Sequence, residues 1–76
     1  MSIQDEALAE SVRTALAADK RLSALPIVVR AASGEIHLKG RVETEEQREL
    51  ATIVVCGIPG VRNLVNDELV VREGGE

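Results

Sequence analysis

The clearest pattern of hydrophobic and polar positions lies in Glu35–Val42. Ile36, Leu38 and Val42 recur at a period of two on one face, and Gly40 completes their row. The charged residues and the histidine of this segment fall on the opposite face. Such alternation is typical of a strand that has one face on a core and one face near water. We therefore predict a half-buried strand over this segment.

An apolar segment rich in β-branched residues, Ile27–Ala32, comes just before it. It is bounded by Pro26 and by the turn signal Ser33-Gly34, as strands commonly are. We predict a second strand here, joined to the first by a tight hairpin in which Gly34 has a positive φ. One face of this strand carries Ile27, Val29 and Ala31, and the other carries Val28, Arg30 and Ala32.

Two further segments carry apolar residues at helical spacing. The first begins near Ser2, a candidate cap three residues before Asp5, and fades near Asp19–Arg21. Its apolar stripe is Leu8, Val12, Ala15 and Leu16. The second begins after Thr44, which forms a capping box with Gln47, and ends near the glycine at position 57. Its stripe is Leu50, Ala51, Val54, Val55 and Ile58.

The last apolar segment, Val61–Val71, predicts a long strand, and residues 72–76 are expected to form a loose tail. The element order is then α-β-β-α-β. We predict an α+β fold in which two helices pack on one face of a three-stranded mixed sheet. The strands on either side of the second helix are parallel and joined by a right-handed crossover. We expect one domain over residues 1–76, with its core at about residues 5–71.

Composition narrows the possible functions. The chain has 76 residues and no aromatic side chain, so its core must be aliphatic. A domain of this size buries roughly 60% of its unfolded-chain surface, and we expect binding at the surface rather than in a deep pocket. A net charge of −4 and the lack of stacking side chains disfavour nucleic acid as a partner. One cysteine excludes an internal disulfide and a cysteine-based zinc site, and we expect no cofactor.

Membrane and targeting signals are not evident in the sequence. No apolar run approaches the length of about 20 residues that a transmembrane helix needs. The acidic N-terminal segment lacks the basic start and apolar stretch of a signal peptide. We expect a cytoplasmic location for the chain as written, or a periplasmic one if it is an excised or mature domain.

Several segments, taken in order, carry a family resemblance. They are the first helix with Asp19 after it, the strand I-V-V-R, the strand G-E-I-H-L-K-G-R-V, the charged helix start Glu45–Ala51 and the closing G-V-R-N-L-V-N. Their order and spacing resemble the BON domain (bacterial OsmY and nodulation) over about Asp5–Val71. The resemblance implies a non-enzymatic module. Family members are associated with phospholipid binding, with osmotic stress proteins, and with partner domains in transport or regulatory proteins.

The last strand departs from the family pattern. Regular alternation after Asn66 would place an apolar residue where Glu68 stands, whereas Leu69–Val71 are apolar. A bulge or a one-residue change of phase near Asn66–Glu68 would reconcile the two patterns. The facing of the residues in the last strand stays open at this point.

Single residues offer little chemistry. His37 is the only histidine, lacks a partner for a metal site or a catalytic dyad, and is interpreted as a surface residue. Cys56 is expected to be buried as a small hydrophobic residue rather than to be a reactive thiol. Four carboxylates near the start of the second helix are interpreted as a solvated first turn rather than as a metal or acid–base site. They are Glu43, Glu45, Glu46 and Glu49.

The helix-free face of the sheet is the candidate binding site. Alternation gathers Arg30, His37, Lys39 and Arg41 there, with Val28, Ala32 and either Val70 or Leu64. A cationic patch mixed with aliphatic side chains can meet anionic lipid headgroups or a partner's sheet. The alternative is a solvated face whose cations pair with Glu35 and Glu68 across strands.

We expect a non-enzymatic binding module that acts through this face. Its partner would be phospholipid headgroups or a protein in a transport or stress-related system. One alternative is a structural homo-oligomer that hides the open face or the edge of the last strand. A cation-binding sensor domain, as in some family relatives, is another alternative.

Overall fold

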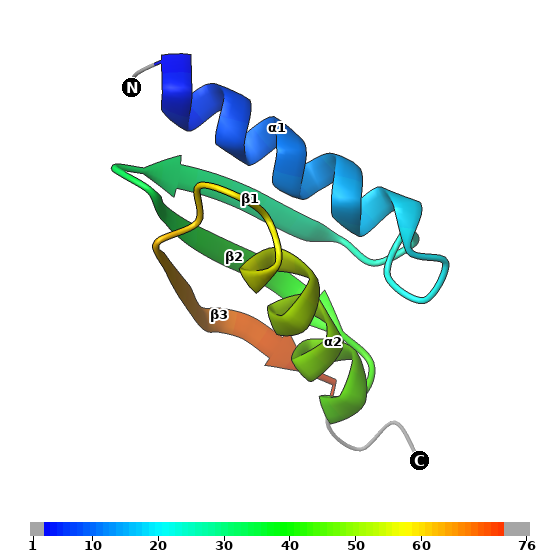
Figure 1. Ribbon diagram of the computed structural model, residues 1–76. Coiled ribbons are helices and arrows are strands. Elements are labelled where there is room, and N and C mark those ends of the chain that lie inside the picture. The colour runs from blue at the N-terminus through cyan, green and yellow to red at the C-terminus, as the bar shows by residue number, and fades with distance from the viewer. Residues whose placement is uncertain (1–2, 73–76) are drawn as a thin grey trace.

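The computed structural model describes residues 3–72 and has two helices and three strands in the order α-β-β-α-β (Figure 1). The elements are α1 (Ile3–Ala18), β1 (Ile27–Ala32), β2 (Glu35–Val42), α2 (Glu45–Cys56) and β3 (Asn63–Val71). β2 is the central strand, antiparallel to β1 and parallel to β3. The predicted α+β fold with a mixed sheet is therefore confirmed.

The predicted boundaries of β1 and β2 agree with the structure. β3 begins two residues later than predicted, because Val61 still belongs to the turn after α2 and donates its backbone N–H to the Ile58 carbonyl at 3.2 Å. The proposed cap Ser2 and residues 73–76 of the proposed tail lie outside the described residues.

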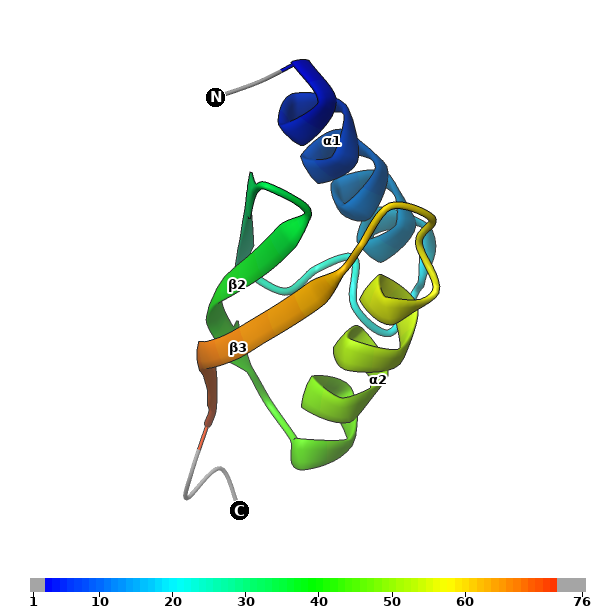
Figure 2. The same cartoon turned by 60° about the vertical axis from the view of Figure 1, so that its left-hand side comes forward.

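Both helices lie on the same side of the sheet, which gives the domain two layers (Figure 2). The core between the layers is wholly aliphatic, as the composition requires. Val12 and Leu16 enter it from α1, and Ala51 and Val55 from α2. The sheet contributes Val29, Ala31, Ile36, Leu38, Val42 and Leu69, and Leu22 closes one end from the loop after α1. No element within residues 3–72 covers the other side of the sheet (Figure 2).

The β1–β2 hairpin turns through Ser33-Gly34, with φ values of 54° and 83°. Positive φ at both central residues defines a type I′ turn, whose twist matches that of the flanking strands. The prediction for Gly34 is confirmed, and Ser33 shares the left-handed conformation. The turn keeps Ala32 opposite Glu35 and so fixes which residues of β1 and β2 share a face.

The start of α2 is held by the predicted capping box. Thr44 Oγ1 accepts a hydrogen bond of 3.1 Å from the Gln47 backbone N–H. Gln47 Oε1 in turn accepts the backbone N–H groups of Thr44 and Glu43, at 3.3 and 2.7 Å. These bonds satisfy backbone groups that would otherwise lack partners at a helix N-terminus.

β3 contains a bulge in the segment where the sequence suggested a bulge or a change of phase. His37 pairs with Val65 and Lys39 with Glu68, so one extra residue of β3 lies between these two pairs. The bulge turns Leu69 toward the core, where it is 1% exposed, and leaves Val70 56% exposed on the open side. Leu64 lies opposite the buried Ile36, so the suggestion that it joins the open face is wrong, whereas Val70 does lie there.

Candidate functional site

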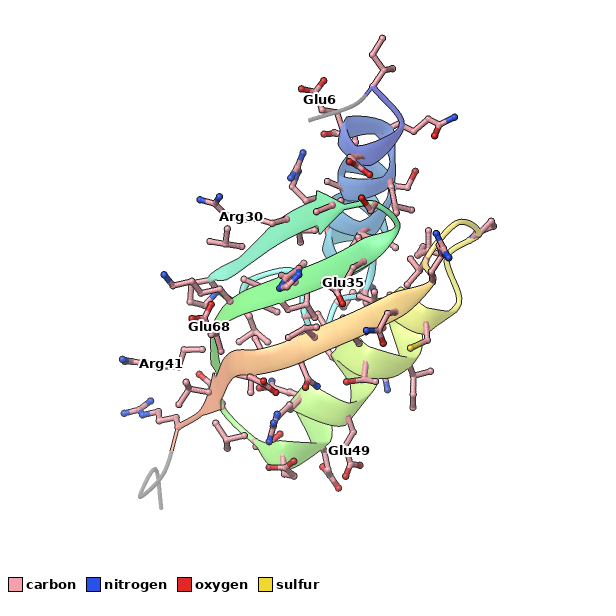
Figure 3. All side chains as sticks on the ribbon, turned by 90° about the vertical axis from the view of Figure 1, so that its left-hand side faces the viewer. Glu6, Arg30, Glu35, Arg41, Glu49 and Glu68 are labelled. Atoms are coloured by element: carbon pink, nitrogen blue, oxygen red, sulfur yellow. The ribbon has the colours of Figure 1, made fainter. Side chains whose placement is uncertain are left out.

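The open face is the outer row of the sheet, and its residues form four rungs across the strands. The rungs are Ala32–Glu35–Asn63, Arg30–His37–Val65, Val28–Lys39–Glu68 and Arg41–Val70. Figure 3 shows the strands from this side, with Arg30, Glu35, Arg41 and Glu68 labelled. The period-two alternation of β1 and β2 thus brings the four predicted residues, Arg30, His37, Lys39 and Arg41, onto one surface. Their part in binding stays a prediction.

The open face mixes cations with exposed aliphatic side chains. Val28 is 53% exposed and Val70 is 56% exposed, and each shares a rung with a lysine or an arginine. Among the ion pairs within residues 3–72, none joins Arg30, Lys39 or Arg41 to a carboxylate within 4.0 Å. The exposed acids of α2 belong to the layer behind the sheet, at Glu45, Glu46 and Glu49, whereas Glu6 of α1 lies at the margin of the open face, where it lines a cavity with Arg30 (Figure 2). Charge is therefore only partly segregated between the two sides.

The carboxylate of Glu35 is held in a small network on the first rungs. The Asn63 side-chain amide donates a hydrogen bond to Glu35 Oε2 at 2.9 Å, and His37 Nε2 lies 2.8 Å from Glu35 Oε1. The Asn63 hydrogen bond, followed by that of His37, lowers the pKa of Glu35, because both favour the ionised carboxylate. The alternative, in which basic residues of this face pair with its acids, is met only in part, by the contact of His37 with Glu35. These two lie along one strand rather than across strands.

Two features of the surface were missed or misjudged from the sequence. Val65 is a further apolar member of the open face, and only its pairing with His37 reveals this. Cys56 is exposed, so the expectation that it is buried is wrong. It follows the fully buried Val55, and one residue along a helix turns a side chain by about 100°, away from the core.

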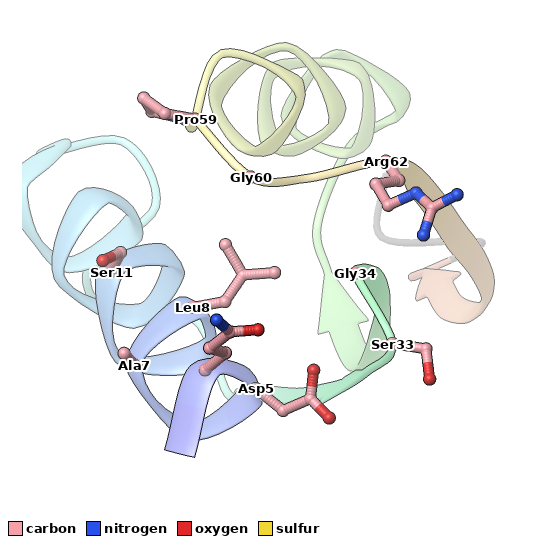
Figure 4. A pocket seen from close by; sticks show the side chains of 10 residues that line it. Asp5, Ala7, Leu8, Ser11, Ser33, Gly34, Pro59, Gly60 and Arg62 are labelled. Atoms are coloured by element: carbon pink, nitrogen blue, oxygen red, sulfur yellow. The ribbon is translucent and has the colours of Figure 1, made fainter. Parts of the chain in front are cut away.

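A cavity lies elsewhere, where the start of α1, the β1–β2 turn and the α2–β3 loop meet (Figure 4). It has a volume of about 690 Å³, and Leu8, Ser11, Ser33 and Arg62 are among its lining residues. The chain's one histidine, His37, is not among the residues that line it. The serines of this lining therefore have no imidazole base beside them, and the lining does not present a serine–histidine dyad.

Within residues 3–72, no group of three or more histidine, cysteine, aspartate or glutamate side chains is placed to hold a metal ion. Neither described helix is long and apolar enough to cross a membrane.

Comparisons with known proteins fit this geometry. The family profile described as BON domain matches residues 4–73 of the chain. No curated protein sequence matches it significantly. Among solved structures, the fold is similar to the C-terminal domain of CdsD, the structural protein of the type III secretion system of Chlamydia trachomatis. That match has a TM-score of 0.71 and 17% identity, and covers 90% of this chain and 33% of the CdsD chain. At this identity the likeness shows the fold alone, and the chain spans about a third of the CdsD chain.

Proposed function

The chain belongs to the BON domain family, and we propose that it is a non-catalytic module that binds a partner protein through its open face. The proposal rests on the cations of this face that are unpaired within residues 3–72 and on its exposed valines. Arg30, Lys39 and Arg41 lack carboxylate partners within 4.0 Å among the described residues, beside two half-exposed valines. Aliphatic side chains supply apolar contact, and the cations attract acidic groups of the partner.

A protein surface fits this face better than an anionic membrane does. The two carboxylates on the rungs, Glu35 and Glu68, would be brought against lipid phosphates together with the three cations. Each lysine or arginine near such a surface contributes about 1 kcal/mol of binding free energy. Three cations less two carboxylates leave a net charge of +1, which gives only about 1 kcal/mol of attraction. A protein partner can instead place a cation against each carboxylate. A structural component of a secretion system contains a domain of this fold, which also supports assembly between proteins.

The experiment compares two variants that change the net charge equally. Lys39→Glu with Arg41→Glu alters the open face, and Lys20→Glu with Arg21→Glu alters exposed residues of the loop after α1. Tagged proteins are used to capture partners from the organism that encodes the chain, and bound proteins are identified by mass spectrometry and then purified. We expect the purified partner to bind wild type and the loop variant with similar Kd, and the face variant at least about tenfold more weakly.

Two further measurements test whether the open face binds lipid or a second copy of the chain instead. Cosedimentation with vesicles of 30% phosphatidylglycerol in phosphatidylcholine measures binding to an anionic membrane. Vesicle binding that only the face variant loses would replace the protein partner by lipid. Sedimentation velocity at several protein concentrations tests the homo-oligomer, which the same variant would dissociate. A partner that binds all three proteins equally well would contradict the role of the open face.

A further inference from the structure

A groove between α1 and the outer edge of β1 is a second feature that can take a ligand, and we refer to it as the β1-edge groove. Its volume is about 620 Å³. Its lining consists of Asp5, Glu6, Ala9 and Arg13 of α1, the whole of Val28–Ala32, and His37 and Glu68. The groove therefore adjoins the open face and shares residues with it, whereas Lys39 and Arg41 belong to the open face alone. Because the lining includes a continuous run of strand residues, the backbone of β1 is itself part of the wall.

Backbone groups of β1 that face this groove are not used by the sheet. β1 is an edge strand that pairs with β2 alone. The Val29 carbonyl accepts a hydrogen bond of 3.4 Å from Nη1 of Arg13, so this carbonyl points away from β2. In an antiparallel strand the N–H and C=O of one residue point to the same side, and that side alternates along the chain. Val29 and Ala31 therefore present their N–H and C=O groups to the groove.

The other edge of the sheet, on β3, carries features that oppose the addition of a strand. The bulge at Asn66–Asp67 interrupts its backbone, and the acidic residues Asp67 and Glu68 lie together there. Proteins use bulges and charges in this way to prevent pairing between edges. β1 has an unbroken register with β2, and Arg30 is its one charged residue. The edge of β1 is thus the one open to another strand.

We propose that the β1-edge groove binds an extended peptide segment of a partner protein, which adds to β1 as an antiparallel fourth strand. The small side chains of Ala9 and Ala31 leave room beside β1 for the peptide side chains that point toward α1. In a second copy of this chain α1 would lie along β1 as it does here, so the proposed occupant is an isolated peptide segment that no helix covers.

For an antiparallel peptide, the charges along the groove predict where the peptide carries charges of its own. Asp5 lies beside the Ser33-Gly34 turn, so Glu6 marks the end of the groove where β1 finishes (Figure 4). Arg13 lies about two helical turns further along α1, against the middle of β1, and an acidic peptide residue there would share it with Glu10, whose carboxylate is 3.2 Å away. An antiparallel peptide begins beside Glu6 and ends beyond Arg13. We therefore expect a lysine or arginine near its N-terminal end and an aspartate or glutamate near its C-terminal end.

The test uses the peptide acetyl-Lys-Ser-Val-Ser-Val-Ser-Asp-amide, added at millimolar concentrations to ¹⁵N-labelled protein. We expect the amide signals of Val29 and Ala31 to shift, and their hydrogen exchange to slow by about fivefold or more at saturation, because these N–H groups enter a ladder. Two further peptides each carry one backbone N-methyl group, placed on either of two adjacent central residues. Only alternate N–H groups of the peptide face β1, so the affinities of the two should differ. One should bind about fivefold more weakly or worse than the parent peptide, and the other as tightly as the parent.

Controls separate this site from the open face. A peptide with lysine at both its first and last positions, and one with aspartate at both, should each bind more weakly than the parent peptide, which has one of each. The Lys39→Glu with Arg41→Glu variant should bind the parent peptide as wild type does, even though it fails to bind the open-face partner. The proposal is overturned if exchange at Val29 and Ala31 is unchanged, if both N-methyl peptides bind equally, or if the slowed amides lie on β3.

Discussion

Gly40 is the position where the structure predicts the largest effect of a small substitution. Its φ is +146°, and a Cβ added there would lie 2.0 Å from the Pro26 carbonyl oxygen and 3.0 Å from the Pro26 carbonyl carbon. These atoms are backbone, so no side-chain rotation relieves the contact. Gly40 thus allows the start of β1 to approach the end of β2, which aligns the open face.

The expected cost of Gly40→Ala has two parts. The unfavourable φ contributes about 1–3 kcal/mol. Overpacking against fixed backbone contributes about another 1–3 kcal/mol. A domain of this length has a free energy of unfolding of roughly 4–11 kcal/mol, so the substitution removes a large share of it.

The assay is urea unfolding followed by far-ultraviolet circular dichroism, because the chain has no aromatic residue for fluorescence. Gly57→Ala is the matched control, since the nearest atoms to its added Cβ, the Ile53 and Val54 carbonyl oxygens, lie at 3.6 Å. We expect Gly57→Ala to be neutral or up to about 1 kcal/mol more stable. Trimethylamine N-oxide can refold Gly40→Ala if it is unfolded in buffer. Equal stability of Gly40→Ala and wild type would refute the reasoning.

Three further predictions concern the bulge, the helix cap and the Glu35 network. In urea unfolding, Leu69→Ala should lower the free energy of unfolding by about 2–5 kcal/mol and Val70→Ala by less than about 0.5 kcal/mol. A larger loss for Val70→Ala than for Leu69→Ala would mean that the bulge does not turn Leu69 into the core. Thr44→Ala should cost about 1 kcal/mol by the same assay, and no loss would mean that the capping box is not formed in solution. Asn63→Ala should raise the pKa of Glu35 in a carbon-13 titration, whereas Asn66→Ala, which removes a bond to Thr52, should leave it unchanged. Because folding lowers this pKa, the stability that Glu35 contributes is present above its unfolded pKa and is lost as pH falls through the folded value.

Local sequence signals were sufficient for most of the fold. The alternation in Glu35–Val42 and the turn residues Ser33-Gly34 determine the hairpin and its faces, because period and turn type are local properties. The bulge in β3 was also predictable, since Leu69 could not be buried without a change of phase. The exposure of Cys56 was predictable from the helical period, because Cys56 directly follows Val55 of the buried stripe and so faces away from it.

The candidate surfaces depend on contacts between distant segments and were less predictable. Val65 joins the open face only through its register with His37, which no local pattern of β3 determines. The register between β2 and β3 also decides that Val70 lies on the open face and Leu64 does not. The β1-edge groove requires the position of α1 relative to β1, seen in the contact between Arg13 and Val29. Side-chain packing between elements fixes that position, and spacing along the chain does not reveal it.

The central claim is that the open face is the binding surface. It is tested most directly by mapping amide chemical-shift changes on ¹⁵N-labelled protein when the captured partner is added. We predict that the largest changes fall on the outer-row residues of the sheet, among them Arg30, His37, Lys39 and Arg41. Changes confined to α1 and α2, with these four amides unmoved, would contradict the account.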